Sequence, residues 1–336
     1  MLNFDEARFL RIQSGAVERI EPIRDVIRAS LPDAENLFFL GTGGAATLME
    51  PAVQILQRRS RFPVLRETAA ELTISGSLHL GPKSIVVIPS LSGTTAESVA
   101  ALAYCRERGA KIVSLVGKGD TPLGRDADHA IVNFAEDDTS SESFYIQSLA
   151  IALSIMSERG EFEGFAELSA NLRALPAALL AAKRAFEPDA ERLAETIKDD
   201  GYHIISGAGS TWPEAFYYGM CILEEMQWIR TRPVHASDFF HGTLELVEQG
   251  VSVILCKGED EFRPLVERVE KFARRYTDKV RVIDTATFAL PGIADATRKL
   301  ISPIVLATLF ERLSAHLEAK RDHPLTTRRY YKRVDY

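Results

Sequence analysis

The sequence predicts an α/β fold made of two similar domains, each a parallel sheet flanked by helices. Short, almost continuously apolar runs alternate with longer helical patterns, which is typical of a parallel sheet covered on both faces. An apolar strand followed by Gly-x-Gly occurs twice, at Gly41 and at Gly207. These glycines are 166 residues apart (207 − 41), about half of the 336-residue chain, as expected for a duplication.

Apolar runs and helical periodicity predict the elements of both halves. A helix is expected over 94–108, because apolar residues recur at Val99, Leu102 and Cys105 before Gly109. An Ala-rich helical stretch spans about 168–198, and a long helix about 293–319. The predicted strands are 36–40, 84–89, 111–116 and 130–134 in the first half, and 202–205, 251–255 and 279–283 in the second.

These elements divide the chain into three parts. Residues 1–165 form an N-terminal helix and the first domain, 166–198 a helical linker, and 199–336 the second domain with a C-terminal tail. Nearly half of the residues are hydrophobic (46%), which is enough for a large core.

Composition excludes several function classes. The net charge of −7 and a single short basic run, at 328–333, disfavour nucleic-acid binding. The three cysteines are far apart and lack metal-ligand or disulfide spacing, so no metal site is expected. No signal-peptide layout and no apolar run of roughly 18 residues is found, which predicts a cytoplasmic protein without membrane contact.

The first glycine-rich loop allows two interpretations. Gly41-Thr42-Gly43-Gly44-Ala45-Ala46 fits a loose dinucleotide pattern, but the acidic partner that this pattern requires is met only poorly by Glu67. Alternatively, the glycines turn the chain sharply from strand to helix and leave backbone amides facing a ligand. The second interpretation needs no cofactor.

A hydroxyl-rich loop, Ser90-Leu91-Ser92-Gly93-Thr94-Thr95, follows the second predicted strand and begins a helix. Gly93 permits a tight turn, and Ser92 or Thr94 is expected to cap the helix. Free amides at a helix N-terminus attract an anion, and the hydroxyls add donors without adding charge. The loop therefore predicts a phosphate site, although an ordinary N-cap would have the same composition. No Lys follows the glycine, so the loop is not a nucleotide P-loop.

The Ser90–Thr95 loop resembles the Ser-x-Ser-Gly-x-Thr phosphate loop of SIS (sugar isomerase) domains, two of which form the isomerase half of glucosamine-6-phosphate synthases. In that family a catalytic Glu lies sixteen residues before the His of a His-Gly-Pro-Leu motif. Glu225 and His241 have this spacing (241 − 225 = 16), although Thr243 replaces the Pro and Ala45 replaces a phosphate-binding Ser. The resemblance implies two similar SIS domains, each a flavodoxin-like three-layer unit.

The tail, Asp322-His323 followed by Arg328-Arg329-Tyr330-Tyr331, is more similar to deglycases that split 6-phosphorylated Amadori compounds, such as fructoselysine 6-phosphate deglycase. This resemblance implies that Glu225 shuttles a proton between C1 and C2 and that His241 opens the sugar ring. It also implies a sugar-phosphate substrate, no cofactor, and a homodimer with shared active sites. Glu142 and His323 are candidates for residues that contact the leaving amine or that support the catalytic groups from behind. The expected sugar-phosphate ligands are Thr42, Gly43, Ser90, Ser92, Gly93 and Thr95.

Two alternatives remain open. An aldose–ketose isomerase or an amino-sugar-phosphate deaminase could use the same scaffold and the same enediol chemistry. A non-catalytic sugar-phosphate sensor is the other possibility, but it would not need Glu225 and His241.

Overall fold

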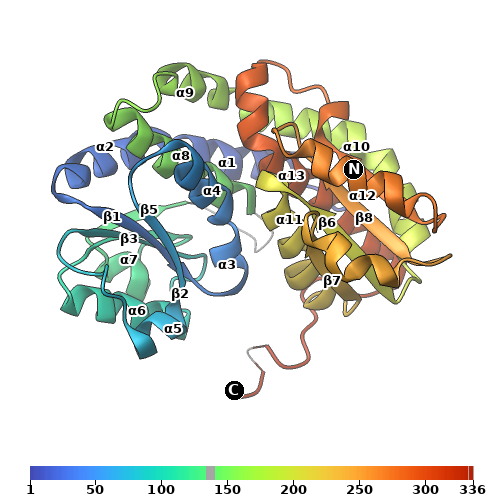
Figure 1. The fold of residues 1–336 in the computed structure, drawn as a ribbon, viewed down its shortest axis with the longest axis horizontal. Helices are drawn as coiled ribbons and strands as arrows, with labels where there is room; N and C mark the ends of the chain where they lie inside the picture. Colours follow the sequence, from blue (N-terminus) through green and yellow to red (C-terminus); the bar gives the residue numbers. More distant parts are fainter. Residues whose placement is uncertain (134–140, 332, 336) are drawn as a thin grey trace. The chain divides into compact units, whose positions relative to one another are not determined.

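The computed structural model describes residues 1–133, 141–331 and 333–335, which divide into two compact units. The N-terminal unit is Glu6–Pro176, and the C-terminal unit combines Met1–Asp5 with Ala177–Tyr336. Each unit is a parallel sheet with helices packed against it (Figure 1). The division falls at Pro176–Ala177, inside the segment predicted to link the domains. The α/β fold with two parallel sheets is therefore confirmed.

The N-terminal sheet has five parallel strands in the order β2-β1-β3-β4-β5. Every residue of β3 is buried, because helices cover both faces of this central strand. The last strand ends at Val132, so the predicted end at 134 lies outside the described residues. The strands are β1 (Asn36–Gly41), β2 (Val64–Thr68), β3 (Ser84–Ser90), β4 (Lys111–Val116) and β5 (His129–Val132).

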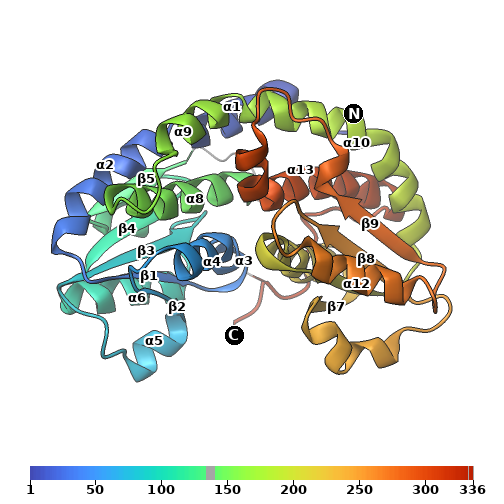
Figure 2. The same ribbon diagram turned by 45° about the horizontal axis from the view of Figure 1, so that its top comes forward.

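Helices cover both faces of this sheet (Figure 2). The helices α5 and α6 pack on one face against Val86 and Ile88, whereas α1, α2 and α4 surround α8. The helix expected over 94–108 is α6 and begins two residues later. The helices are α1 (Glu6–Val17), α2 (Ile20–Ser30), α3 (Gly43–Thr47), α4 (Glu50–Arg59), α5 (Ala69–Ser75), α6 (Ala96–Glu107), α7 (Pro122–Asp126), α8 (Ser141–Glu158) and α9 (Phe165–Arg173), with a 3₁₀ turn, η1 (Leu31–Asp33).

The C-terminal sheet repeats the order of the first four N-terminal strands. Its order β7-β6-β8-β9 matches β2-β1-β3-β4, as expected for a duplicated unit. The sequence analysis did not predict β7, because its residues, Arg-Thr-Arg-Pro-Val-His, are charged and include a proline. Within this strand only Val234 is buried. Such a strand is tolerated at the edge of a sheet. The strands are β6 (Tyr202–Gly207), β7 (Arg230–His235), β8 (Ser252–Lys257) and β9 (Val280–Asp284).

The helices of this unit include one long apolar helix, α13. By length and composition α13 could cross a membrane, but 89% of its most apolar window is buried inside the protein, as in a core helix. The helix expected over 168–198 is interrupted at Ala174, which separates α9 from α10. The elements are α10 (Leu175–Ile197), α11 (Trp212–Tyr217), α12 (Arg263–Ala273), α13 (Asp295–Arg321), the π-helix η3 (Tyr218–Glu224), and the 3₁₀ turns η2 (Gly209–Thr211), η4 (Asp238–His241), η5 (Thr243–Leu246) and η6 (Thr285–Thr287).

A buried ionic cluster ties the first residues of the chain to the C-terminal unit. Arg312, with a side chain 1% exposed, donates from Nε to Glu187 Oε2 (2.7 Å) and from Nη2 to the carbonyl of Leu2 (2.5 Å). Glu187 Oε1 accepts from the Leu2 amide (2.7 Å) and lies 3.1 Å from His316 Nε2. Burial raises the pKa of Glu187. The hydrogen bonds from Arg312 and Leu2 and the nearby positive charges have a larger, opposite effect, so the pKa is lowered to about 2.

Glu187→Gln is expected to destabilise the protein near neutral pH. The pKa of the native carboxyl, about 2 against an ordinary 4.5, corresponds to on the order of 3 kcal/mol of stability. A lowered pKa stabilises the folded state above the ordinary value, and the effect disappears as the pH falls through the folded value. The difference from wild type in urea unfolding should therefore be largest at neutral pH and should shrink as the pH falls from 4.5 towards 2. Glu191→Gln, at a carboxylate 63% exposed on the same helix, is the control and should change little.

Candidate functional site

The N-terminal unit has a topological switch point at the carboxyl ends of β1 and β3. The strand β1 has β2 on one side and β3 on the other, so the connections that leave β1 and β3 diverge at this edge. Ligands of open α/β sheets bind at such a point. Thr42 and Gly43 follow β1 and are exposed, and Ser90–Thr95 is the connection from β3 to α6. The structure thus brings the two predicted ligand loops to one edge of the sheet.

Internal hydrogen bonds shape the Ser90–Thr95 loop. Ser90 is buried; its Oγ accepts from the Gly93 amide (3.1 Å) and lies 3.0 Å from Thr95 Oγ1. Ser92 is exposed, and its Oγ accepts from both the amide (3.3 Å) and the hydroxyl (3.1 Å) of Thr94. Gly93 has φ +64°, and a Cβ there would overlap the Thr121 side chain. The loop is therefore a fixed turn that only glycine fits at its centre.

The prediction that Ser92 or Thr94 caps the helix after this loop is wrong. The N-cap residue of α6 is Thr95, not Ser92 or Thr94, and Thr95 makes no side-chain capping hydrogen bond. Ser92 instead accepts hydrogen bonds from its near neighbour Thr94. The amides in the first turn of a helix need an acceptor, and a bound anion can supply it. The twelve-residue helix α6 thus presents an uncapped N-terminus beside exposed hydroxyls.

The corresponding loops of the C-terminal unit are occupied by the protein's own carboxylate. Asp260, after β8, accepts through Oδ2 from the amide (3.0 Å) and the hydroxyl (2.6 Å) of Ser210, in the Gly-x-Gly loop after β6. Its Oδ1 accepts from the amide of Phe262 (3.0 Å). Asp260 therefore uses the donors that an external anion would need, and its charge would repel one. The switch point of the N-terminal unit therefore has exposed donors, whereas the donors at the equivalent edge of the C-terminal unit are bound by Asp260.

Glu225 directly follows an unusual helical segment. The π-helix η3 runs from Tyr218 to Glu224, and the Glu225 amide donates to the carbonyl of Met220 (3.2 Å), five residues earlier. π-helical segments are rare and occur frequently at functional sites. Trp228, shortly after it, has φ +55°, which a non-glycine residue seldom adopts. The sequence contains no simple signal for either feature.

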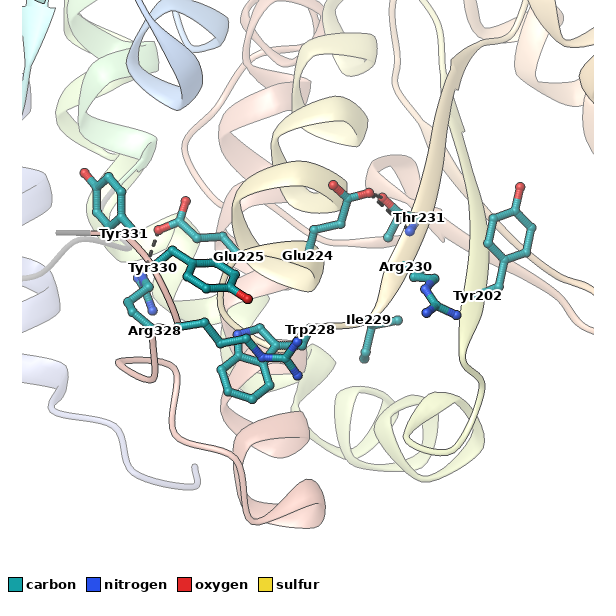
Figure 3. Close-up of a pocket in the computed structure, with 11 residues that line it drawn as sticks. Tyr202, Glu224, Glu225, Trp228, Ile229, Arg230, Thr231, Arg328, Tyr330 and Tyr331 are labelled. Carbon is teal, nitrogen blue, oxygen red and sulfur yellow. Dashed lines mark hydrogen bonds and ion pairs between the residues drawn. The ribbon is translucent and has the colours of Figure 1, made fainter. Parts of the chain in front are cut away.

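Glu225 lies in a cavity of about 710 Å³ within the C-terminal unit (Figure 3). Its side chain is 35% exposed, and its Oε1 is 3.0 Å from Nε of Arg328, a tail residue. Arg328 also donates to the carbonyls of Leu325 (2.6 Å) and Thr327 (3.0 Å), so it is held at several points. The cavity is lined by Tyr202, Glu224, Glu225, Trp228, Ile229, Arg230, Thr231, Arg328, Arg329, Tyr330 and Tyr331.

The tail is fastened beside this cavity by buried contacts. Gln227, fully buried, donates from Nε2 to the carbonyl of His323 (2.7 Å). The ring of His323 meets Trp228 edge-on, with 4.5 Å between centroids. The amide of Leu325 donates to Glu318 on α13 (2.9 Å). His323 thus lies behind a cavity residue and is not itself among the lining residues.

The other two candidates lie elsewhere. His241 ends η4, is exposed, and does not line the cavity that contains Glu225. Glu142 lies in the first turn of α8, in the N-terminal unit, and is fully buried. The sequence interpretation also missed Trp228, Arg230 and Tyr202 as cavity residues. Tyr202 begins a strand that was predicted, whereas Trp228 and Arg230 lie just before and at the start of β7, which was not recognised as a strand.

Comparison with known proteins agrees with this architecture. A family model for the SIS domain matches residues 30–157. The chain is 30% identical to the fructosamine deglycase FrlB of Bacillus subtilis over 311 residues, which cover 90% of this chain and 93% of the relative. The protein belongs to the SIS family. It is also 26% identical to the fructoselysine 6-phosphate deglycase of Escherichia coli K12, over 89% of this chain and 86% of the relative.

Solved structures of other SIS-family proteins have the same fold. A Bacillus subtilis protein described as a phosphosugar isomerase superimposes with a TM-score of 0.88 and 27% identity, covering 96% of this chain and 99% of the other. A Salmonella typhimurium protein with the same description gives 0.87 and 29%, covering 94% and 97%. The predicted pair of SIS domains is confirmed.

Gly93→Ala is expected to weaken phosphate binding and lower stability. A side chain at φ +64° costs about 1–2 kcal/mol, and the overlap with Thr121 forces the turn to shift. Calorimetry with a sugar phosphate, together with thermal unfolding, should reveal both losses. Gly81→Ala is the control in the same unit, because nothing lies within 4 Å of a Cβ built there. Unchanged affinity in Gly93→Ala would contradict a role for this turn in phosphate binding.

Proposed function

We propose that the protein is a cytoplasmic hydrolase, a fructosamine 6-phosphate deglycase. Its substrate is a 6-phosphorylated 1-amino-1-deoxy-ketose, and its products are an aldose 6-phosphate and a free amine. The observation that carries this proposal is the carboxylate of Glu225 in a cavity of about 710 Å³, in a chain that is 30% identical to a fructosamine deglycase over 90% of its length. Such a cavity has the size of a small-molecule site.

The reaction reverses the rearrangement that forms an Amadori compound. After the ring opens, a base removes a proton from C1 and an enaminol forms. Return of a proton to C2 leaves an imine between C1 and the nitrogen. Water then adds to C1, the C1–N bond breaks, and the nitrogen leaves as the amine. The oxidation change at C1 is balanced at C2, so the net reaction is a hydrolysis and requires no external oxidant.

Each group has a task in this sequence. Glu225 accepts the C1 proton and returns it to C2, and Arg328 holds its carboxylate in place. His241 assists ring opening as an acid and base, since the two ring nitrogens of an imidazole can donate and accept a proton. The phosphate is bound by the N-terminus of α6 with Ser90, Ser92, Gly93 and Thr95, and by Thr42 and Gly43. Glu142 and His323 are retained only as residues that support the amine or the catalytic groups.

An aldose–ketose isomerase or an amino-sugar-phosphate deaminase is the second candidate, and the descriptions of the two similar solved structures favour the isomerase. It would use the same proton transfer between C1 and C2. The two functions differ in their substrates, so a panel of 6-phosphorylated Amadori compounds separates them. Release of an aldose 6-phosphate supports the deglycase. No release, with isomerisation of simple sugar phosphates, supports the alternative.

Glu225→Gln is expected to lower kcat by about 10²–10⁴-fold while ligand binding persists, because the amide has nearly the same shape but cannot accept the proton. Turnover is measured by the release of aldose 6-phosphate, and binding by calorimetry with a non-reactive sugar phosphate. Glu191→Gln makes the same change at an exposed carboxylate of the same unit and should leave kcat unchanged. Unaltered turnover in Glu225→Gln would rule out this mechanism.

The proposal includes a homodimer whose active sites combine Glu225 of one subunit with His241 of the other. The exposure of His241, away from the cavity of its own chain, supports this arrangement. Glu225→Gln and His241→Asn should each be inactive alone. Mixed after dissociation in equal amounts, they should recover about a quarter of wild-type activity, because half of the dimers are mixed and each carries one intact site. No recovery, with mixed dimers verified by two affinity tags, would show that both groups act within one chain.

A further inference from the structure

The cavity beside Glu225 extends well beyond the carboxylate (Figure 3). Glu225 lies with Arg328, Tyr330 and Tyr331 at one end, while Arg230 and Tyr202 lie at the other. The proposed proton transfer requires only the end that contains Glu225. The remaining space is lined by a mixture of cations and aromatic rings, which indicates a second ligand group of its own chemistry.

Two arginines of the cavity are available for a ligand anion. Arg328 is already engaged by Glu225. The Arg230 side chain is exposed and forms no ion pair or hydrogen bond with the described part of the chain. Arg329 contacts the ring of Trp228, with 3.9 Å from its guanidinium carbon to the centroid, and has no carboxylate partner among the described residues. Arginine binds carboxylates through a planar pair of N–H donors.

The acidic residues of the cavity do not outweigh its arginines, since the described lining has three arginines (Arg230, Arg328 and Arg329) and two glutamates (Glu224 and Glu225). Glu224 Oε1 accepts from the amide (3.2 Å) and the hydroxyl (2.5 Å) of Thr231. Glu225 is paired with Arg328. Each carboxylate is thus held locally, and Arg230 and Arg329 remain as the free cationic groups of the described lining. A bound carboxylate would meet a net attraction from these two residues.

Aromatic rings supply an apolar surface in the same cavity. Trp228 is 37% exposed and is fixed there by its left-handed backbone conformation and by the ring of His323. Tyr202, Tyr330 and Tyr331 are the other aromatic residues of the lining. Rings with this arrangement bind flat or long apolar groups and add little entropy cost, because each has few rotatable bonds.

We propose that this cavity binds the departing amine as an amino acid with a free carboxylate and an aromatic or long apolar side chain. Arg230, assisted by Arg329, binds the carboxylate, and Trp228 packs against the side chain. The inference rests on the proposed function, because the amine of an Amadori compound is bonded to C1, the carbon from which Glu225 removes the proton. The amine substituent therefore begins next to Glu225 and extends along the cavity.

Three synthetic substrates test the assignment. They carry phenylalanine, phenethylamine or glycine on C1 of the same 6-phosphorylated ketose. Phenethylamine lacks only the carboxylate of phenylalanine, and glycine lacks only its side chain. We expect kcat/KM to be highest for the phenylalanine adduct and about tenfold or more lower for each of the others.

Arg230→Gln should lower kcat/KM for the phenylalanine adduct by about tenfold and leave the phenethylamine adduct unchanged. Arg275→Gln is the matched control, since Arg275 is an exposed arginine of the same unit that does not line the cavity. It should preserve the preference for the carboxylate. Equal kcat/KM for phenylalanine and phenethylamine adducts, or an unchanged preference in Arg230→Gln, would overturn the assignment without affecting the deglycase proposal.

Product binding separates the failure of this inference from the failure of the proposed function. L-Phenylalanine should change the fluorescence of Trp228 in the full chain more strongly than phenethylamine does, and Arg230→Gln should remove the difference. If no adduct is cleaved but phenylalanine binds in this way, the deglycase proposal fails and the cavity assignment stands. If phenylalanine produces no response that depends on Arg230, the cavity assignment is overturned.

Discussion

The candidate site of the N-terminal unit depends on one constraint: the connections that follow β1 and β3 leave the edge of the sheet in opposite directions. A parallel sheet directs the carboxyl end of every strand to one edge, and the order β2-β1-β3-β4-β5 makes the connections after β1 and β3 separate there. Two loops that are distant in sequence, at Thr42 and at Ser90–Thr95, thereby face the same space. Their glycines allow this turn geometry, and the uncapped start of α6 adds the amides.

The two units share a strand order, but the equivalent edges of their sheets are built differently. The strands of the C-terminal unit follow the same order, but Asp260 satisfies the donors of Ser210 at the equivalent edge. An internal carboxylate stabilises this edge permanently and closes it to anions. The cavity of this unit lies elsewhere, at the end of the π-helix η3 and along the start of β7. Similar topology therefore does not imply similar sites.

Sequence patterns predicted the parts of the structure that depend on local chemistry. Continuous apolar runs identified β1, β3, β4, β6 and β8, because strands buried on both faces need such residues. The Ser90–Thr95 loop was recognisable from its hydroxyls and its glycine. The strand β7 was missed because edge strands tolerate charge and proline, and the N-cap of α6 because several hydroxyl residues could have served. The cavity arises from contacts between residues about 100 positions apart, such as Glu225 and Arg328, which no local pattern contains.

The cavity and the tail depend on each other. The left-handed conformation of Trp228 costs on the order of 1–3 kcal/mol, so it persists only where its surroundings enforce it. Those surroundings are the tail and the end of α13: Gln227 donates to the carbonyl of His323 in the tail, and the carbonyl of Gln227 accepts from Arg321, the last residue of α13 (3.3 Å). The same tail segment then supplies Arg328 to Glu225 and Arg329 to Trp228. The tail therefore contacts the carboxylate of Glu225 through Arg328 and the ring of Trp228 through Arg329, so the first residues of the C-terminal basic run are part of the cavity wall.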